Sequence, residues 1–240
     1  MPNCLFTHTS AYILDMVNTK SSISVTFSGP MPYYKDRVYE FNLPAGHTCP
    51  QAHECLMKAD RETGKMVNGP AQRFRCYAAA AERFPGVRDA RWRNLEAVKK
   101  AKDIVALINP AIPKKADRIR IHGSGDFFKQ SYFDAWIEIA KLNPDKLFWA
   151  FTKSVQFWVK RRDDIPPNFI MQASRGGKKD HLIEEHGLKS ATVFRTLEDA
   201  IKSGMPIDID DTYACSNQGS FALVDNFGPD HGGRTLLNKE

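Results

Sequence analysis

The sequence predicts an α/β fold: a small or incomplete (β/α) barrel with a cysteine-rich, metal-binding segment near its N-terminal third. From residue 117 onward, short apolar strand-like runs alternate with helical runs, which is typical of βαβ units and a parallel sheet. Five or more such units suggest a barrel, and a length of 240 residues is small for eight complete units, so an irregular or incomplete barrel is expected. A doubly wound open sheet is the alternative.

Hydrophobic periodicity and turn residues place the individual elements. An alternating, β-branched run predicts an early strand, and apolar residues repeating every three positions predict one long helix before residue 109. The expected strands span 22–27, 36–42, 118–122, 147–152, 169–173, 191–194, 207–210 and 220–224. The expected helices span 78–82, which Pro85-Gly86 separates from the next helix, then 88–108, 131–142, 155–162, 180–186 and 197–203.

Composition favours one globular domain over residues 1–240, with an N-terminal strand-and-loop segment (1–48) and a cysteine-bearing insertion (49–77). The chain is 42% hydrophobic and 26% charged, which is ordinary globular usage. It has no run of about 18 apolar residues that would span a membrane and no signal-peptide pattern. We therefore expect a cytoplasmic protein, with no membrane partner, that keeps its thiols reduced for metal binding.

Three of the five cysteines, Cys49, Cys55 and Cys76, lie in a segment broken by prolines and a glycine. Thiols in an irregular loop can converge on one metal ion, and zinc is expected here. A barrel would bring the late Cys215 near the early strands, which makes it the natural fourth thiolate. Three unrelated buried cysteines are the alternative, since free cysteine is commonly buried.

Glycines and carboxylates follow two of the predicted strands, at the ends that carry catalytic groups in parallel α/β folds. The run Gly123-Ser-Gly-Asp126 lets the backbone approach a ligand and presents one carboxylate; a tight turn in which Asp126 caps a helix is the alternative. The run Asp208-Ile-Asp210-Asp211 places carboxylates in apolar surroundings. Burying their charge costs free energy unless they take part in catalysis, form ion pairs or lie at the mouth of the barrel. Two separated carboxylates suit glycosyl chemistry, in which one attacks or stabilises an anomeric carbon and the other handles a proton. The catalytic candidates are Asp126, Asp210 and Asp211.

Another glycine pair stands beside basic residues after the strand at 169–173, where it can cradle a phosphate or a planar base. A plain loop is the alternative. The substrate-binding candidates from these strand ends are Gly123, Ser124, Gly125, Phe127, Gln172, Ser174, Arg175, Gly176 and Gly177.

Positive charge is concentrated next to the cysteine segment. The net charge is +6, and residues 58–103 hold 12 basic and 6 acidic side chains, a surplus equal to the whole net charge. Such a region favours a polyanionic partner, although a solvated helix surface is the alternative for any one charge. The candidates for DNA contact are Arg73, Arg75, Arg91, Arg93 and Lys99.

Three short motifs, Leu43-Pro-Ala-Gly-His-Thr-Cys-Pro, Arg75-Cys-Tyr-Ala and Gly123-Ser-Gly-Asp-Phe, resemble those of bacteriophage DNA deazaguanine transglycosylases, viral relatives of the tRNA-guanine transglycosylases. The resemblance implies a zinc-bearing (β/α) barrel that flips a guanine out of double-stranded DNA and exchanges it for a 7-deazaguanine base of the preQ0 type. It implies a covalent bond between deoxyribose and an aspartate, either Asp126 or one of Asp210 and Asp211. The tRNA enzymes carry their zinc ligands late in the chain, whereas most thiols here come early.

Two other functions fit the same residues. The early cysteine triad that ends in Cys76-Tyr-Ala also resembles radical S-adenosylmethionine enzymes, although their usual C-x3-C-x2-C spacing is absent. That resemblance implies an iron–sulfur cluster with S-adenosylmethionine. A non-catalytic nucleic-acid-binding protein with a structural zinc is the third possibility.

Overall fold

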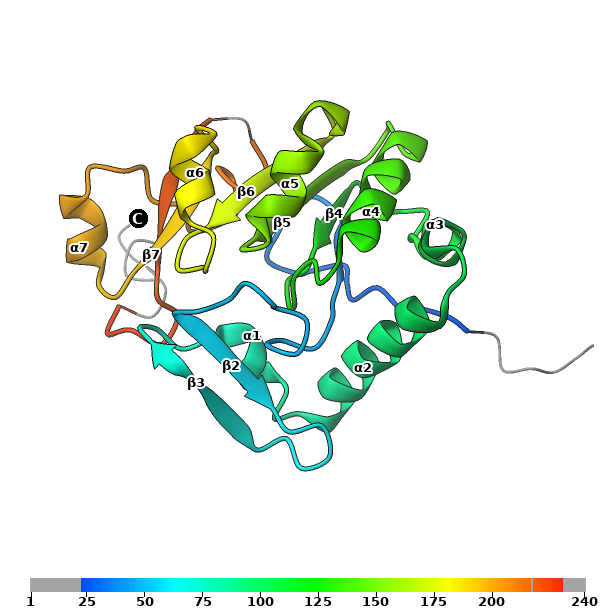
Figure 1. The fold of residues 1–240 in the computed structure, drawn as a ribbon, viewed down its shortest axis with the longest axis horizontal. Helices are drawn as coiled ribbons and strands as arrows, with labels where there is room; N and C mark the ends of the chain where they lie inside the picture. Colours follow the sequence, from blue (N-terminus) through cyan, green and yellow to red (C-terminus); the bar gives the residue numbers. More distant parts are fainter. Residues whose placement is uncertain (1–22, 217, 231–240) are drawn as a thin grey trace, which may run out of the picture.

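The computed structural model describes residues 23–216 and 218–230 and contains a six-stranded parallel sheet (Figure 1). The strands lie in the order in which they occur along the chain, from β1 at one edge to β8 at the other. Each neighbouring pair is parallel. The strands are β1 (Val38–Phe41), β4 (Arg118–Ile121), β5 (Leu147–Thr152), β6 (Phe169–Ser174), β7 (Ser190–Phe194) and β8 (Phe221–Val224).

Helices connect successive strands, and an antiparallel hairpin interrupts the first connection. The helices are α1 (Tyr77–Ala81), α2 (Pro85–Lys100), α3 (Ile104–Ile108), α4 (Gln130–Leu142), α5 (Val155–Lys160), α6 (His181–Glu185) and α7 (Leu197–Lys202), with 3-10 turns η1 (Asn109–Ala111) and η2 (Arg162–Asp164). The hairpin consists of β2 (Cys55–Ala59) and β3 (Met66–Gln72). None of the helices in the described part of the chain is both long and apolar enough to cross a membrane.

Alternation along each strand gives the sheet two different faces. Ile119, Ile121 and Phe148 point toward the helices and join the main core with residues of α2 to α6. The β7–β8 end of the same face packs on α7 through Ala200, Ala222 and neighbouring apolar side chains. All the connecting helices from α2 to α7 therefore cover one face, and Figure 1 shows α4, α5 and α6 side by side over it.

The other face carries the alternate residues. Val38, Trp149, Ile170, Ala191 and Phe221 form a smaller apolar cluster there, covered by the segments around residues 31–34 and 213–215. Toward the carboxyl ends of the strands this face carries polar side chains instead. Alternation along the strands therefore decides which face the polar side chains occupy, and the common direction of the strands decides at which edge of the sheet they gather.

The predicted α/β class and parallel sheet are confirmed. Helices on one face and a strand order that follows the chain differ from a doubly wound sheet, in which the order reverses and both faces are covered. β1 and β8 are the edges of the sheet, so it does not close into a barrel through these strands.

Several predicted elements were wrong in local detail. The helix expected at 88–108 is two helices, because Ala101 is extended and Asp103 starts α3 by accepting a bond from Ala106 N. The helix expected from residue 88 begins earlier, at Pro85, since the first helical position needs no N–H donor; Pro85 thus separates α1 from α2 as expected. The described part of the run at 22–27 forms no strand and is followed by a single antiparallel bridge, Ser28 to Glu40.

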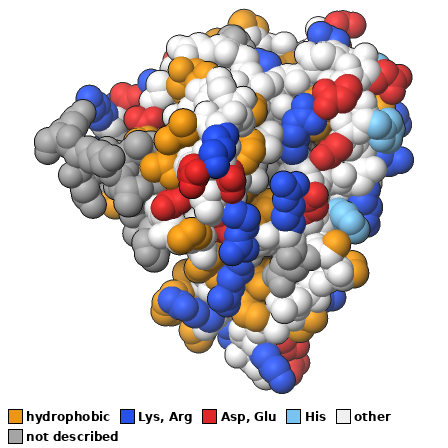
Figure 2. Space-filling model, turned by 90° about the vertical axis from the view of Figure 1, so that its left-hand side faces the viewer, with side chains coloured by type: hydrophobic (Ala, Val, Ile, Leu, Met, Phe, Trp, Pro, Cys, Tyr) orange, Lys and Arg blue, Asp and Glu red, His pale blue; other side chains and the backbone are white. Residues whose placement is uncertain are grey.

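Basic side chains gather on one face of the molecule, with acidic side chains beside them (Figure 2). The side of the molecule at the left of Figure 1, where β3 ends, faces the viewer in Figure 2. Figure 2 shows Lys and Arg side chains in a band down the middle of that face, interspersed with hydrophobic side chains.

Cys4 and His8, which the sequence left without interpretation, lie outside the described residues.

Candidate active site

A cavity of about 620 Å³ opens at the carboxyl ends of the parallel strands. Its walls come from the segment after β4, the ends of β5, β6 and β8, and the loop at 208–211. The cysteine-bearing segment covers it from above the strand ends. A volume of this size is ordinary for a small-molecule site, since such sites span roughly 300–1,000 Å³.

Three thiols converge on this cavity from three separate places: Cys49 in the loop after β1, Cys55 at the start of β2, and Cys76 at the N-terminus of α1. All three are free and partly buried. Burial, the Asp126 carboxylate and the neighbouring Cys76 raise the pKa of Cys49 well above its usual value. Burial raises the pKa of Cys55 to about 11, which the nearby Lys153 ammonium partly opposes. The thiols are therefore close enough to feel one another's charge.

Main-chain groups already point at two of the sulfur atoms. Gly46 N donates to Cys49 Sγ at 3.3 Å, and Ala79 N donates to Cys76 Sγ at 3.5 Å. Such donors stabilise thiolate ligands and tune bound metal. Among the residues that the structure describes, however, no three His, Cys, Asp or Glu side chains form a group that could hold a metal ion.

Cys215 does not join the other thiols. It packs beside the apolar cluster on the cavity side of the sheet, where burial and the Asp211 carboxylate raise the pKa of its thiol to about 12 and Arg118 opposes the rise. Arg118 begins β4, so Cys215 lies toward the opposite end of the sheet from the cavity mouth. The four-thiolate zinc site expected from the sequence is not formed by these residues, because the loop at 211–216 turns back toward the amino ends of the strands.

The glycine pair expected to bind substrate holds the cysteine segment instead. Gly176 O accepts bonds from His53 N at 3.2 Å and Glu54 N at 3.0 Å, and Gly177 forms a bridge with Ala52. The N–H groups of both glycines are taken by Asp180. Neither glycine lines the cavity.

Asp126 and Lys153 form the polar wall nearest the thiols. Asp126 is buried, and its carboxylate accepts bonds from Thr152 Oγ1 at 2.6 Å and Lys153 N at 2.9 Å. Burial raises the pKa of Asp126 to about 6 despite these donors. Lys153 is also buried, and its Nζ donates to Ser174 O, Ser174 Oγ and Arg175 O. The wall thus holds one charge of each sign.

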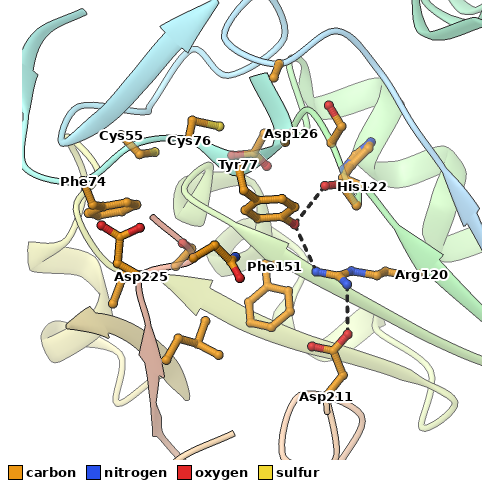
Figure 3. A pocket seen from close by; sticks show the side chains of 18 of the residues that line it. Cys55, Phe74, Cys76, Tyr77, Arg120, His122, Asp126, Phe151, Asp211 and Asp225 are labelled. Atoms are coloured by element: carbon orange, nitrogen blue, oxygen red, sulfur yellow. Dashed lines mark hydrogen bonds and ion pairs between the residues drawn. The ribbon is translucent and has the colours of Figure 1, made fainter. Parts of the chain in front are cut away.

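The opposite wall centres on Arg120, which strand alternation turns toward the cavity face. Its guanidinium pairs with Asp211 at 2.9 Å and Glu40 at 3.6 Å, and donates to Tyr77 Oη at 3.2 Å. Tyr34 also donates to Asp211. Figure 3 shows Cys55 and Cys76 at one end of the cavity, the Arg120–Asp211 pair at the other, and Phe151 between them.

The run 207–210 is a loop rather than a strand, joined to the sheet by one bridge from Ile207 to Ala222. Asp208 is buried and accepts a bond from Ala214 N at 2.9 Å, while burial raises its pKa to about 6. Thr212 lowers the pKa of Asp210 through hydrogen bonds. Asp208, Asp210 and Asp211 line the same cavity as Asp126. Carboxylates from the early and the late part of the chain therefore line one cavity, as expected, although the late ones lie in a loop and not in a strand.

Other candidates divide between the cavity and the core. Gly123, Ser124, Gly125 and Ser174 line the cavity. Phe127 is fully buried in the main core, because the turn at 123–126 directs it toward α4. Gln172 is fully buried and directs its amide at the carbonyls of the 213–216 loop. The Arg175 side chain pairs with Glu184 at 2.6 Å and does not line the cavity.

The arginines and the lysine predicted to contact DNA differ in their exposure. Arg91 is buried in an ion pair with Glu82 at 2.9 Å and donates to Ala78 O, so it is not free to meet DNA. Arg93 and Lys99 are exposed on α2. Arg73 and Arg75 are exposed beside the cavity, and Arg75 lines it.

Sequence reasoning left several cavity residues unassigned: Tyr33, Tyr34, Phe74, Tyr77, Arg120, Lys153 and Asp225. Arg120 had a usable signal, because it is the charged residue between Ile119 and Ile121 in a strand whose apolar face must be buried. Lys153 follows directly on a predicted strand. Tyr77 begins the short helix α1, and the others lie in loops, for which no periodic signal exists.

Comparison with known proteins places the chain in a family. The profile described as Gene product 88 matches residues 13–232, nearly the whole chain. The chain belongs to the Gene product 88 family. It is 34% identical over 90 residues to the Gene 88 protein of Mycobacterium phage L5, a match that covers 32% of this chain and 38% of that relative. This likeness supports the predicted bacteriophage origin. No solved structure matches this chain.

Proposed function

We propose that this protein is an iron–sulfur enzyme of the radical S-adenosylmethionine type. The observation that carries the proposal is the convergence of Cys49, Cys55 and Cys76 on one cavity. That cavity lies at the carboxyl ends of a parallel sheet whose strands follow chain order and whose helices cover one face. Such a sheet is the arrangement expected of an incomplete (β/α) barrel, with its active site at this end.

Three cysteines at one cavity match in number the thiolates of a cluster with one open position, and they would have to draw together to hold it, because in this structure the described residues form no group that could bind a metal ion. A four-iron cluster takes four ligands, usually thiolates. Cys215 lies elsewhere, so the cavity offers three thiolates, two of them already approached by backbone N–H donors. One iron would then be left for an external ligand, as binding of S-adenosylmethionine requires. When bound, the cluster and S-adenosylmethionine together supply radical chemistry that no side chain can perform.

The chain's own residues would bind and orient the nucleoside. Lys153, fixed on Ser174 and the Arg175 carbonyl, places a positive charge beside the thiols. It would offset the negative charge of thiolates that burial alone disfavours. Phe151 and Phe74 provide apolar walls on the same cavity, and Ser174 and Asp126 provide hydrogen-bonding groups.

The test is anaerobic reconstitution with ferrous iron and sulfide. We expect a brown protein with about four irons per chain, whose visible absorption bleaches on reduction. Cys49→Ser, Cys55→Ser and Cys76→Ser should each lose most of the bound iron, whereas Cys215→Ser should keep it. A colourless protein that binds zinc and loses it in the Cys215→Ser variant would refute the proposal.

A second candidate, exchange of guanine for a 7-deazaguanine in DNA, is favoured by the carboxylates of the same cavity. Asp208 has a pKa raised to about 6 and Asp210 a lowered one, so below about pH 6 Asp208 is mostly protonated while Asp210 is ionised. Pairs of this kind divide acid and nucleophile roles in glycosyl transfer. Incubation of the metal-free protein with double-stranded DNA and labelled guanine would then give incorporation that Asp210→Asn abolishes; no incorporation would remove this candidate.

A further inference from the structure

The mouth of the cavity combines arginines with exposed aromatic rings. Arg75 lies over the Phe227 ring at 5.1 Å, and both line the cavity. Phe227 is 46% exposed. Arg195 donates to Arg73 O at 3.4 Å, which joins the end of β7 to the end of β3. We call Arg73, Arg75, Arg195 and Phe227 the arginine rim.

The charges of the arginine rim are available to an outside partner. The Arg73 and Arg195 side chains are 64% and 56% exposed. Their ion pairs are long, 3.6 Å to Glu54 and 3.7 Å to Asp225. Ion pairs with an exposed guanidinium and so long a separation contribute little, although the partner of Arg195 is itself buried, so a phosphate can compete for the guanidinium groups.

The interior has the opposite charge balance. Five lining side chains are acidic and three are basic: Asp126, Asp208, Asp210, Asp211 and Asp225 against Arg75, Arg120 and Lys153. Phosphate is therefore disfavoured inside. A group that carries N–H donors is favoured, because carboxylates accept the hydrogen bonds of base amino and imino groups.

Asp225 points to such a ligand. It directly follows β8, is 2% exposed and lines the cavity; its Oδ2 lies 3.7 Å from Arg195 Nε but accepts no hydrogen bond within the described residues. Figure 3 shows its carboxylate next to the Phe74 ring. A buried carboxylate oxygen that accepts no hydrogen bond and lies beside an aromatic ring suits a planar ring with an N–H group.

We infer that the arginine rim binds the phosphates of a nucleic-acid strand and that an unpaired base of that strand enters the cavity. The cationic rim fits the phosphates of a polyanion, and the acidic, aromatic interior fits a planar ring that carries N–H donors. Enzymes that act on a base commonly take it out of the stack in this way. The inference names the substrate of the cavity to which the proposed function assigns chemistry, but the binding itself needs no cluster.

The test is fluorescence anisotropy with a labelled DNA duplex that contains one bulged guanine, compared with the perfect duplex. Wild-type protein should bind the bulged probe more tightly. The triple variant Arg73→Gln/Arg75→Gln/Arg195→Gln should bind it at least about tenfold more weakly, with a salt slope lower by roughly two to three.

The matched control is Arg93→Gln/Lys99→Gln/Lys100→Gln, which removes three exposed charges from α2, on the other side of the molecule from the end of β3. It should change the affinity by less than about threefold, because screened charges outside the rim contribute little at physiological salt. Equal losses in both triple variants, or no binding by the wild type, would overturn the inference.

A second variant tests entry of the base. Phe227→Ala should abolish the preference for the bulged probe while the salt slope stays unchanged; a retained preference would overturn base entry. Melting curves of every variant show whether it folds. Iron content after reconstitution is measured in parallel, so lost binding with a normal cluster counts against this inference and leaves the proposed function standing.

Discussion

The segment that carries the thiols and the loop that carries the aspartates flank the same cavity, but different forces hold them there. Backbone hydrogen bonds fix the cysteine segment: Gly176 O receives His53 N and Glu54 N, and Lys178 N reaches Gln51 O at 2.9 Å. Side-chain carboxylates fix the 208–216 loop, through Asp208 to Ala214 N and Asp211 to Arg120. Main-chain bonds do not titrate, whereas carboxylates do, so the aspartate side should respond more strongly to pH and to loss of charge than the thiol side, where Asp180 holds the N–H groups of Gly176 and Gly177.

The largest expected effect is on the aspartate side. Arg120→Leu leaves Asp211 and Glu40 buried without their cation, and loss of one partner of a buried pair costs about 3–5 kcal/mol. Urea denaturation should show this loss. The control is Arg37→Leu, which breaks an exposed pair with Asp117 and should cost no more than about 1 kcal/mol. Similar losses in the two variants would mean that the loop is not held by charge.

Protonation of Asp208 should give the next largest effect. Its pKa is raised by burial to about 6, above the ordinary carboxyl value, so the folded state binds the proton more tightly than the unfolded state. The contribution of Asp208 to the free energy of unfolding is then largest at low pH and falls as the pH rises from about 4 to about 6, by up to about 3 kcal/mol. Asp208→Asn should flatten that fall in melts recorded across this range. Flattening should be partial, because Asp126 shifts in the same direction; an unchanged profile would contradict the burial of Asp208.

A smaller effect is expected where the cysteine segment meets the sheet. Gly176 has φ +91°, and a Cβ there would lie 2.8 Å from Glu54 Oε2 and 3.1 Å from its Cβ. Gly187 also has positive φ (+57°), but a Cβ there would meet nothing within 4 Å. Each alanine substitution should cost about 1–2 kcal/mol of backbone strain, and Gly176→Ala about 1 kcal/mol more. Gly176→Ala should also speed alkylation of Cys49 and Cys55, but not of Cys215; equal behaviour of both variants would argue against docking through the glycines.

Regular parts of the chain were predictable, because burial of one face imposes a repeat that the residues must show. β5 was expected at 147–152 and lies there, and α4 and α7 differ from their predicted bounds by one residue at one end. The β2–β3 hairpin was missed, since it pairs with itself beside the cysteines and has no clear alternation. The loop at 208–211 was taken for a strand because Ile207 and Ile209 alternate with aspartates, although only Ile207 bridges to the sheet.

Residue types and their order alone determined that this protein would have a parallel sheet with functional groups at its strand ends, because strand direction puts every carboxyl end at one edge. Tertiary structure alone decided which groups meet there. It placed Cys49, Cys55 and Cys76 at one cavity and left Cys215 outside it, turned Gly176 and Gly177 into a docking site, and buried Arg91 against Glu82. The physical reason is that loops carry no repeat: their positions depend on hydrogen bonds and charges between residues far apart in the chain.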